Sequence, residues 1–365
     1  MAATDLVVLD NTITYEGSGF PTLDALIIKT INRDDLMEEY KQYTSLMDYT
    51  DTTLLNPFQT FSAKSAPKGL QNINETGIKP RVDFAFTPKK WIYQQEIAGE
   101  FSSSYLFTQW ARNAQTIKGA SDSIQAELAD VASQTRDLVL AYDIRYAEEE
   151  VKLWANWFSV TAANGPGSAT PKGNPLFYAY QPYGVPGTPI TGTFSNIVTG
   201  AVYTDIATGT AQLQNALNLI KQTKDENGKF IAEPKNWYKL YTSKVRAVFW
   251  KQVLNDNSQY SGQGTNANQM NQFNFKGNIV ELVILNLLGQ PDSLTWANIG
   301  SADNAFLTNP DYLKKAQAFR TYRLYNPRVK SFENMETDEL QTSIRAIVGV
   351  DHYGAELGIV GIQWS

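Results

Sequence analysis

Only one residue in this sequence is a conventional acid–base catalyst near neutral pH. His352 lies between Asp351 and Tyr353. A Ser-His-Asp hydrolase also needs a positioned serine, and the sequence contains no G-x-S-x-G elbow. One histidine and no cysteine exclude histidine-rich and thiolate metal sites, and no EF-hand loop is present. We therefore expect His352 in an exposed structural turn between two strands, and we expect neither catalysis nor a metal or cofactor.

Carboxylates occur side by side in three places: Asp34/Asp35, Glu38/Glu39 and Glu148/Glu149/Glu150. Glycoside hydrolysis needs two carboxyl groups facing each other across a cleft. Sequence neighbours on a helix do not face each other, so we expect solvent-exposed helix faces. The glycine-containing segments 165–174 and 262–264 lack the spacing of a phosphate-binding loop.

A basic cluster is more unusual. Six cations share 17 residues that contain no acidic residue, interleaved with aromatic rings: Lys314, Lys315, Arg320, Arg323, Arg328 and Lys330. Such a pattern could follow a phosphate backbone. It could equally form ion pairs with an acidic neighbour such as another subunit. The net charge of -6 argues against general nucleic-acid binding.

The composition is that of a folded protein with a real core. The chain has 365 residues, of which 42% are hydrophobic, enough for two domains. Residues 1–11 carry no basic residue and no long apolar run, so we expect no signal peptide and synthesis in the cytoplasm. The most apolar stretch, 279–288, contains Glu281 and Asn286 and is too short to cross a bilayer. We therefore expect no membrane contact.

A long helix is predicted over 121–159. Asp122 and Gln125 form a capping pair, and no Gly or Pro occurs between Gly119 and Gly165. Apolar residues recur at helical spacing in two stripes: Ile124, Leu128, Val131, Leu138, and then Leu140, Ile144, Ala147, Val151, Trp154, Phe158. About 38 residues would extend about 57 Å, roughly the full width of a globule of this length. This favours the spine of a flat or elongated subunit.

Before that helix the chain reads as extended. Gly17, Gly19 and Pro21 argue against a helix in residues 1–33, and a helix is predicted from Asp34 or Asp35 to Met47. The alternation of 82–86 predicts a strand whose return partner is 91–97, within a projecting hairpin over 50–100. A shorter helix is predicted over 101–114.

After residue 200 the pattern alternates between helix and strand. Helices are predicted at 212–224, at 244–254 with Ser243 as its cap, and after Pro310. Strands are predicted at 237–242, 279–288, 294–299 and 357–364. Leu340, Thr342, Ile344, Ala346 and Val348 alternate with mostly polar residues, which predicts a half-buried strand. The fold class is therefore α+β.

This order of parts resembles the major capsid protein of tailed bacteriophages, the Hong Kong 97-type fold. The resemblance is carried by the hairpin 82–97, the helix 122–159, the block 210–288, and a closing segment made of 318–322, 326–328, 338–350, 353–354 and 361. It implies an N-terminal arm (1–55), an extended loop (56–100), a peripheral domain with the spine helix (101–164 and 326–365) and an axial domain (165–325).

The resemblance also implies a function. The chain would be a non-enzymatic subunit of an icosahedral virion shell, with copies of itself in pentamers and hexamers, scaffolding and portal proteins, and packaged DNA on the inner face as partners. Aromatic residues of the arm and extended loop would be buried against neighbouring subunits: Phe58, Phe61, Phe84, Phe86, Trp91 and Tyr93. The alternatives are an encapsulin-like nanocompartment shell, another virion component such as a tail or portal-associated protein, and a carbohydrate-binding or carbohydrate-hydrolysing protein suggested by the Trp, Tyr and Asn content.

Overall fold

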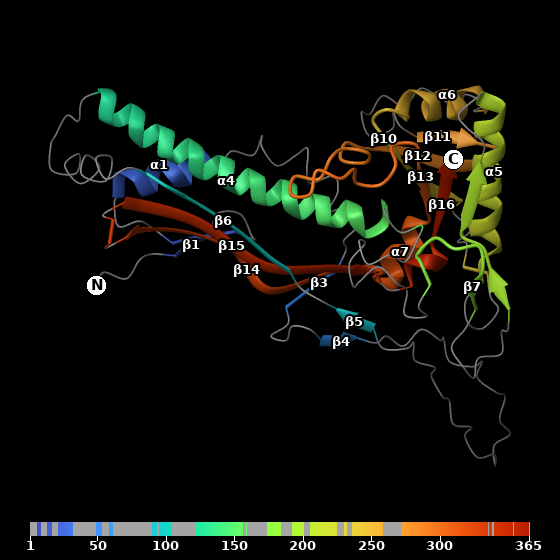
Figure 1. The fold of residues 1–365 in the computed structure, drawn as a ribbon. Coiled ribbons are helices and arrows are strands. Elements are labelled where there is room, and N and C mark those ends of the chain that lie inside the picture. Colours follow the sequence, from blue (N-terminus) through green and yellow to red (C-terminus); the bar gives the residue numbers. More distant parts are fainter. Residues whose placement is uncertain are drawn as a thin grey trace, which may run out of the picture.

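The computed structural model shows an elongated molecule: a first lobe in which one long helix lies along a sheet, and a compact second lobe beyond the C-terminal end of that helix (Figure 1). It describes residues 6–8, 13–16, 21–31, 49–52, 58–60, 90–92, 95–103, 122–155, 158, 174–183, 192–200, 205–224, 230–231, 236–257, 272–334, 336–337, 339–352 and 354–364. Within these residues no helix is both long enough and apolar enough to cross a membrane. The mixture of helices and sheets confirms the α+β class.

The predicted long helix is present as α4, Asp122–Ala155. Its 34 residues correspond to about 51 Å at 1.5 Å per residue. Buried apolar residues recur along it at Val131, Val139, Ala147 and Val151, and their direction turns around the helix so that the first two and the last two enter different cores. Val139 belongs to neither stripe expected from the sequence. The helix therefore bridges the lobes, as Figure 1 shows.

The first sheet consists of six strands: β1 (Leu6–Val8), β2 (Thr14–Glu16), β3 (Tyr49–Thr52), β6 (Gln95–Ser102), β14 (Phe319–Asn334) and β15 (Glu339–His352). The strands β14 and β15 form a long antiparallel hairpin at its centre, and β6 pairs with the other edge of β15. Short N-terminal strands complete the sheet, because β2 and β3 each pair in parallel with β14.

One face of the first sheet packs on helices. The inward residues of β15 are all buried, as the alternation predicted: Leu340, Thr342, Ile344, Ala346 and Val348. They form a core with residues of α4 and of α1 (Pro21–Ile31), including Leu23 and Ile27. The other face of these strands carries the polar members of the alternation.

The second sheet has strand order β11-β12-β10-β13-β16-β9. Its strands are β9 (Ile197–Gly200), β10 (Trp237–Ser243), β11 (Gln272–Phe275), β12 (Asn278–Leu285), β13 (Ala305–Thr308) and β16 (Ile359–Trp364). Helices α5 (Ile206–Gln222) and α6 (Ala247–Asn257) pack on it around the buried Trp250. Gly209 permits their close approach, since a Cβ there would lie 2.7 Å from Phe249 and Val253.

Shorter elements complete the described chain: α7 (Pro310–Ala316), the 3-10 turn η4 (Ala355–Leu357), and two small ribbons, β4 (Phe58–Thr60) with β5 (Lys90–Ile92) and β7 (Gln181–Pro182) with β8 (Thr193–Phe194). A third core lies between the lobes, where Ala147 and Val151 of α4 meet Phe177, Phe306 and Phe319. The two lobes therefore share buried apolar surface.

The N-terminal segment corrects one expectation. Residues 21–31 form helix α1, although we expected Pro21 to exclude a helix over 1–33. Proline is favourable at the first helical position, where its missing N–H would have no partner in any case. Leu23 and Ile27, four residues apart, then pack into the first core. The helix expected from Asp34 or Asp35 to Met47 lies outside the described residues.

The extended-loop hairpin is also different in detail. Residues 82–86 lie outside the described residues, and the expected return strand 91–97 is divided between two sheets. Trp91 pairs with Gln59 in the β4–β5 ribbon, whereas 95–97 begin β6. Phe101 and Ser102 end that strand, so the helix expected over 101–114 does not begin at residue 101.

Two helix starts and one expected strand in the α/β region differ from the prediction. The helix expected at 212 begins at Ile206, because the Asp205 carboxylate accepts the Thr208 N–H and caps it. The helix expected at 244 begins at Ala247, and Ser243 Oγ accepts the Arg246 N–H in the preceding turn. Residues 294–299 are a loop, not a strand, with an isolated bridge between Pro291 and Asn298.

We predict that Val151→Gly destabilises the subunit far more than Ala141→Gly in the same helix. Val151 is buried in the core between the lobes, whereas Ala141 is exposed. The exposed change should lower the free energy of unfolding by about 1 kcal/mol, the helix-propensity difference. The buried change adds lost apolar contact and should cost about 3 kcal/mol. Urea denaturation of unassembled subunits measures both, and equal losses would contradict the placement of α4.

Candidate functional site

The histidine does not lie where the sequence predicted it. His352 is fully buried rather than exposed in a turn, because β15 continues to residue 352 and pairs it with Phe319. The turn follows later, at Gly354 and η4. Within the described ranges no three acidic or histidine side chains gather as a metal site. The features that remain are a charged cluster between the lobes and the exposed surfaces.

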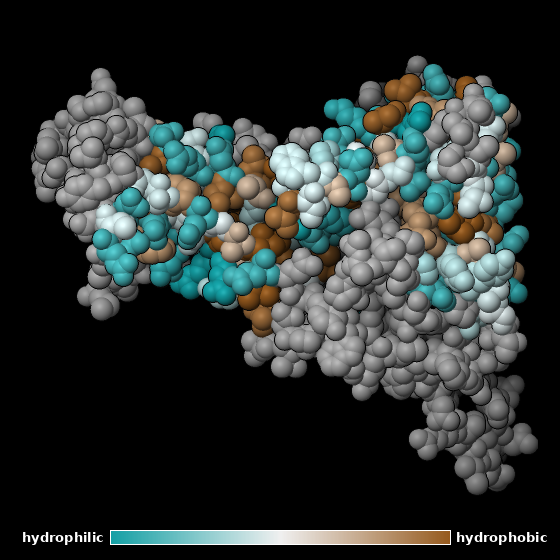
Figure 2. Space-filling model, in the orientation of Figure 1, coloured by the Kyte–Doolittle hydropathy of each residue, from teal (hydrophilic) through white to brown (hydrophobic). Residues whose placement is uncertain are grey.

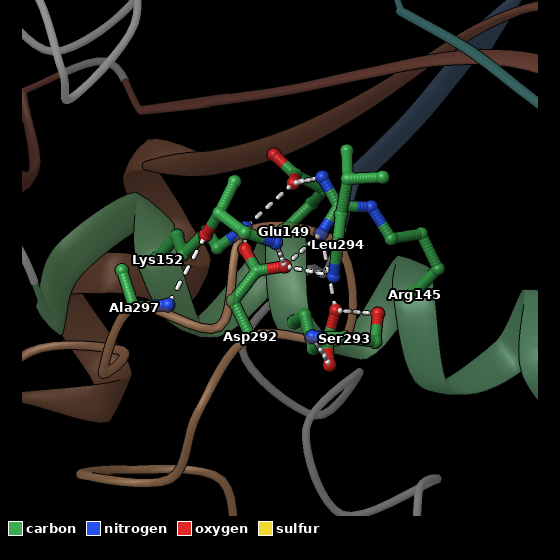
Figure 3. Close-up of polar contacts among 9 residues, drawn as sticks. Arg145, Glu149, Lys152, Asp292, Ser293, Leu294 and Ala297 are labelled. Atoms are coloured by element: carbon green, nitrogen blue, oxygen red, sulfur yellow. Dashed lines mark hydrogen bonds and ion pairs between the residues drawn. The ribbon is translucent and has the colours of Figure 1, made fainter.

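The charged cluster joins α4 to the loop 286–304, which connects β12 to β13. The helix supplies Arg145, Glu148, Glu149 and Lys152, and the loop supplies Asp292 (Figure 3). Arg145 and Lys152 lie two turns apart on one side of the helix, so both reach the same carboxylate. We call these five residues the charged junction.

Asp292 is the centre of the charged junction. Its Oδ1 lies 2.9 Å from Arg145 Nη1, and its Oδ2 pairs with Lys152 Nζ. Arg145 also contacts Glu149 at 2.6 Å and Glu148 at 3.1 Å, and Lys152 contacts Glu149 at 3.1 Å. Asp292 and Glu148 are each only 2% exposed, so solvent screens these contacts weakly.

Backbone groups of the loop complete the junction. Glu148 accepts the Ser293 N–H at 2.9 Å and the Ser293 hydroxyl at 2.6 Å. Asp292 Oδ1 accepts the N–H groups of Leu294 at 2.6 Å and Thr295 at 3.2 Å. Three carboxylates thus face two cations, and amide and hydroxyl donors supply the remaining positive ends. The loop is thereby fixed to the helix.

This arrangement corrects the interpretation of Glu148/Glu149/Glu150 as a solvent-exposed helix face. Glu148 and Glu150 are buried, and Glu149 is partly buried. The spacings of Arg145 to Glu148 and Glu149, three and four residues, are those of ion pairs along a helix, a signal that the expectation of an exposed face left unused. Nothing in the sequence indicated that Asp292, 147 residues beyond Arg145, would cover them. The same Asp292 turn is the reason that 294–299 is not a strand.

The six basic residues do not form one compact patch. Lys314 and Lys315 are exposed in the last turn of α7, and the other four lie along β14. Arg320 donates to the Gln317 carbonyl at 2.9 Å, and Lys330 lies over the Phe332 ring. The side chain of Arg323 lies outside the described residues.

Arg328 is already paired within its own chain. It contacts Glu16 of β2 at 2.8 Å and donates to the Tyr325 hydroxyl at 3.4 Å. The Tyr325 contact is the largest cause that raises the pKa of Arg328, followed by the nearby Glu16 charge. On the neighbouring strands Arg345 pairs with Glu96 at 2.7 Å. The outer face of the first sheet therefore carries ion pairs between neighbouring strands rather than unpaired basic residues alone.

The aromatic residues expected at subunit contacts are only partly placed. Phe58 lies in β4 opposite Ile92, and Trp91 lies in β5 opposite Gln59. Phe61, Phe84, Phe86 and Tyr93 lie outside the described residues. The ribbon β4–β5 thus brings together the two ends of the segment 61–89.

Large apolar side chains are exposed at several places on the described surface: Tyr178, Tyr180, Phe230, Val245, Val248, Ile279, Ile284, Leu294, Trp296 and Tyr325. Figure 2 shows that hydrophobic residues on the visible face gather between the two lobes as well as on the second lobe. Leu294 and Trp296 belong to the loop that the charged junction holds. Their exposure was not predicted, because residues 294–299 were expected to form a strand.

Comparisons with known proteins find similarity in fold. No protein-family model matches the chain, and no curated protein matches its sequence. Among solved structures, the capsid of the cyanophage P-SCSP1u has a TM-score of 0.48 and 10% identity, covering 87% of this chain and 86% of that one. A structure of Mycobacterium phage Patience has a TM-score of 0.46 and 12% identity, covering 93% and 88%.

A virus-like particle from Pyrococcus furiosus is similar as well. Its TM-score is 0.41 at 10% identity, covering 91% of this chain and 97% of that one. In each case the similarity extends over most of both chains.

We predict that Asp292→Ala is strongly destabilising and Asp303→Ala is not. Removing Asp292 leaves the Leu294 and Thr295 N–H groups without their acceptor and takes one carboxylate from Arg145 and Lys152, which still share Glu149; the change should cost about 2–3 kcal/mol. Asp303 pairs with Arg246 at 2.7 Å, but its side chain is 43% exposed. Its loss should cost at most about 1 kcal/mol. Thermal and urea unfolding measure the difference, and similar small losses would show that the charged junction does not brace the lobes.

Proposed function

We propose that this chain is a structural subunit that self-assembles into an icosahedral shell enclosing a phage genome. The observation that carries the proposal is the single helix α4 braced against both sheets. It holds the lobes in a fixed, elongated arrangement by shared apolar contact and by the charged junction. A rigid, elongated subunit can contact several neighbouring copies along its length, as a closed shell requires.

The first sheet supports the same proposal. Its inner face packs on α1 and α4, while the outer side chains include the Arg328–Glu16 and Arg345–Glu96 pairs at intermediate to high exposure. A long two-stranded hairpin with only one face in a core offers its other face to neighbouring subunits or to enclosed nucleic acid. The charged side chains of these inter-strand ion pairs disfavour nonspecific association of the sheet with other chains.

The subunit is proposed to have four parts. These are an N-terminal arm (1–55), an extended loop (56–100), a peripheral domain containing α4 (101–164 and 326–365) and an axial domain (165–325). The strand β16 lies in the sheet formed mainly by 197–308, so we assign 359–364 to the axial domain instead. In the same way, all of β14 belongs with α4, although residue 325 was expected as the limit.

The proposed contacts follow from this division. Phe58, Phe61, Phe84, Phe86, Trp91 and Tyr93 would be buried against neighbouring copies in pentamers and hexamers. Lys314, Lys315 and Lys330 are exposed and would contact either packaged DNA or acidic neighbours. Scaffolding and portal proteins are the further partners, and the virion is the location.

Electron microscopy and sedimentation of the purified protein test the proposal directly. Closed icosahedral particles, or pentamers and hexamers that convert to them, are the expected result. Nuclease-protected DNA in particles purified from infected cells supports the genome shell, whereas a packaged protein cargo supports a nanocompartment. A folded, strictly monomeric protein that binds or cleaves glycans would contradict the proposal.

We further predict that Trp91→Ala leaves the subunit folded but impairs assembly, because the ring is assigned to a contact between copies. The subunit concentration needed for assembly should rise about tenfold, which corresponds to about 1.4 kcal/mol per subunit. Trp91→Phe keeps an aromatic ring and serves as the matched control. Circular dichroism checks folding, and loss of the folded soluble subunit would count against the loop assignment.

A further inference from the structure

The loop held by the charged junction carries two unusually exposed side chains. Trp296 is 78% exposed and Leu294 is 69% exposed, the highest values for large apolar side chains in the described chain. Ser293, Thr295 and Ala297 beside them are also exposed. We call Leu294, Thr295 and Trp296 the loop tip. A large apolar tip with a small polar rim is the composition of an interface anchor.

The backbone of the loop tip is fixed before any partner binds. The Asp292 N–H donates to the Ala297 carbonyl at 2.8 Å, and the Trp296 N–H donates to the Asp292 carbonyl at 2.9 Å. The Asp292 carboxylate holds the Leu294 N–H and is itself held by Arg145 and Lys152. Little conformational freedom is therefore lost when the tip is buried, which favours tight contact.

Trp296 adopts a backbone conformation that does not suit its side chain. Its φ angle is +60°, in the left-handed region where glycine and asparagine are at ease and a bulky residue is a rare outlier. Such strain persists where surrounding structure imposes it, and it concentrates at functional positions. A tryptophan that is both strained and exposed gains nothing evident from the fold of its own subunit.

The size and charge of the loop tip limit what can bind it. The tip carries no charged side chain, so it has no electrostatic attraction for nucleic acid. Two side chains also bury far less than the roughly 800 Å² per partner of a stable binary complex. A contact this small becomes effective when it is repeated in an assembly in which other contacts already hold the partners together. That condition is met by copies of one chain in a shell.

We propose that the loop tip inserts Leu294 and Trp296 into the surface of a second copy of this chain in the assembled shell. The inference rests on the proposed function. Because Arg145, Glu148 and Lys152 hold the loop against α4 where the two lobes meet, a neighbour bound there is positioned relative to both lobes of the first subunit (Figure 3).

The first test separates a contact role from a structural one. Trp296→Asn removes the ring and supplies a residue that tolerates φ +60°. The melting temperature of the unassembled subunit should stay the same or rise, while the subunit concentration needed for assembly should rise about tenfold, or about 1.4 kcal/mol. Phe230→Asn removes an aromatic side chain that is 63% exposed in the second lobe and is the matched control.

Two results of this test would overturn the proposal. One is a lowered melting temperature with unchanged assembly, which would make Trp296 a structural residue. The other is equal loss of assembly in Trp296→Asn and Phe230→Asn, which would make the effect one of general surface hydrophobicity. A selective assembly defect in Trp296→Asn supports the proposal.

The second test identifies the occupant. The chain has no cysteine, so Thr295→Cys provides a single thiol between the two anchors for a benzophenone-maleimide probe. Particles assembled from equal amounts of ¹⁵N-labelled and unlabelled subunits are then irradiated and analysed by mass spectrometry. Cross-links between labelled and unlabelled peptides, absent from dissociated subunits, are expected.

The controls separate failure of the proposed shell function from failure of the loop-tip contact. If the folded wild-type chain forms no particles, the proposed function fails. If particles form but Thr295→Cys gives cross-links only within one chain or to a different protein, the proposed function stands and the assignment of the loop tip fails.

Discussion

The structure depends on one helix having two different sets of neighbours. Around its middle α4 packs Val131, Val139 and Tyr142 onto the first sheet. Toward its end Ala147 and Val151 enter the core that includes Phe306 and Phe319. A continuous hydrogen-bonded helix bends little, so the two lobes cannot rotate freely about each other while both contacts are intact. The orientation of the lobes is thus set by the phase of buried residues along a single helix.

The charged junction fixes the position of the second lobe's loop on α4, which the apolar contact alone does not. Burying Asp292 and Glu148 requires removing water from both, and ion pairs of this kind contribute less net stability than apolar groups of the same size. What they impose is position, because each carboxylate oxygen has a particular donor on α4 or on the loop. An apolar contact tolerates sliding by part of a turn, whereas this arrangement of donors and acceptors does not. The loop 286–304 can therefore bind the helix in only one position.

Sequence patterns predicted the elements that have a regular period and a buried face. The long helix and the alternation from Leu340 to Val348 were found because burial repeats along each of them. Patterns failed where a local contact overrode them. Pro21 begins a helix instead of preventing one, and the Asp292 carboxylate turns a segment that otherwise resembles a strand. His352 was misplaced because nothing in the sequence marks where β15 ends.

The candidate site shows the same limit more sharply. Arg145, Glu148, Glu149 and Lys152 have the spacing of ion pairs on a helix, but only a solvent-exposed face was predicted from them. Their burial depends on a loop that is distant in sequence, and so does the exposure of Trp296. The order of elements in the sequence predicted the arrangement of helices and strands, but it did not indicate which part of the second lobe protrudes.

The position of β16 has a consequence for the timing of folding. This strand lies inside the second sheet, between β13 and β9, and it aligns Gly361 with Ile197. During synthesis the sheet therefore stays open until residues 359–364 have left the ribosome, and its closure must wait for a contact of very long sequence separation. A nascent chain that has not yet exposed residues 359–364 therefore lacks the strand that joins β13 to β9, and its second lobe cannot close.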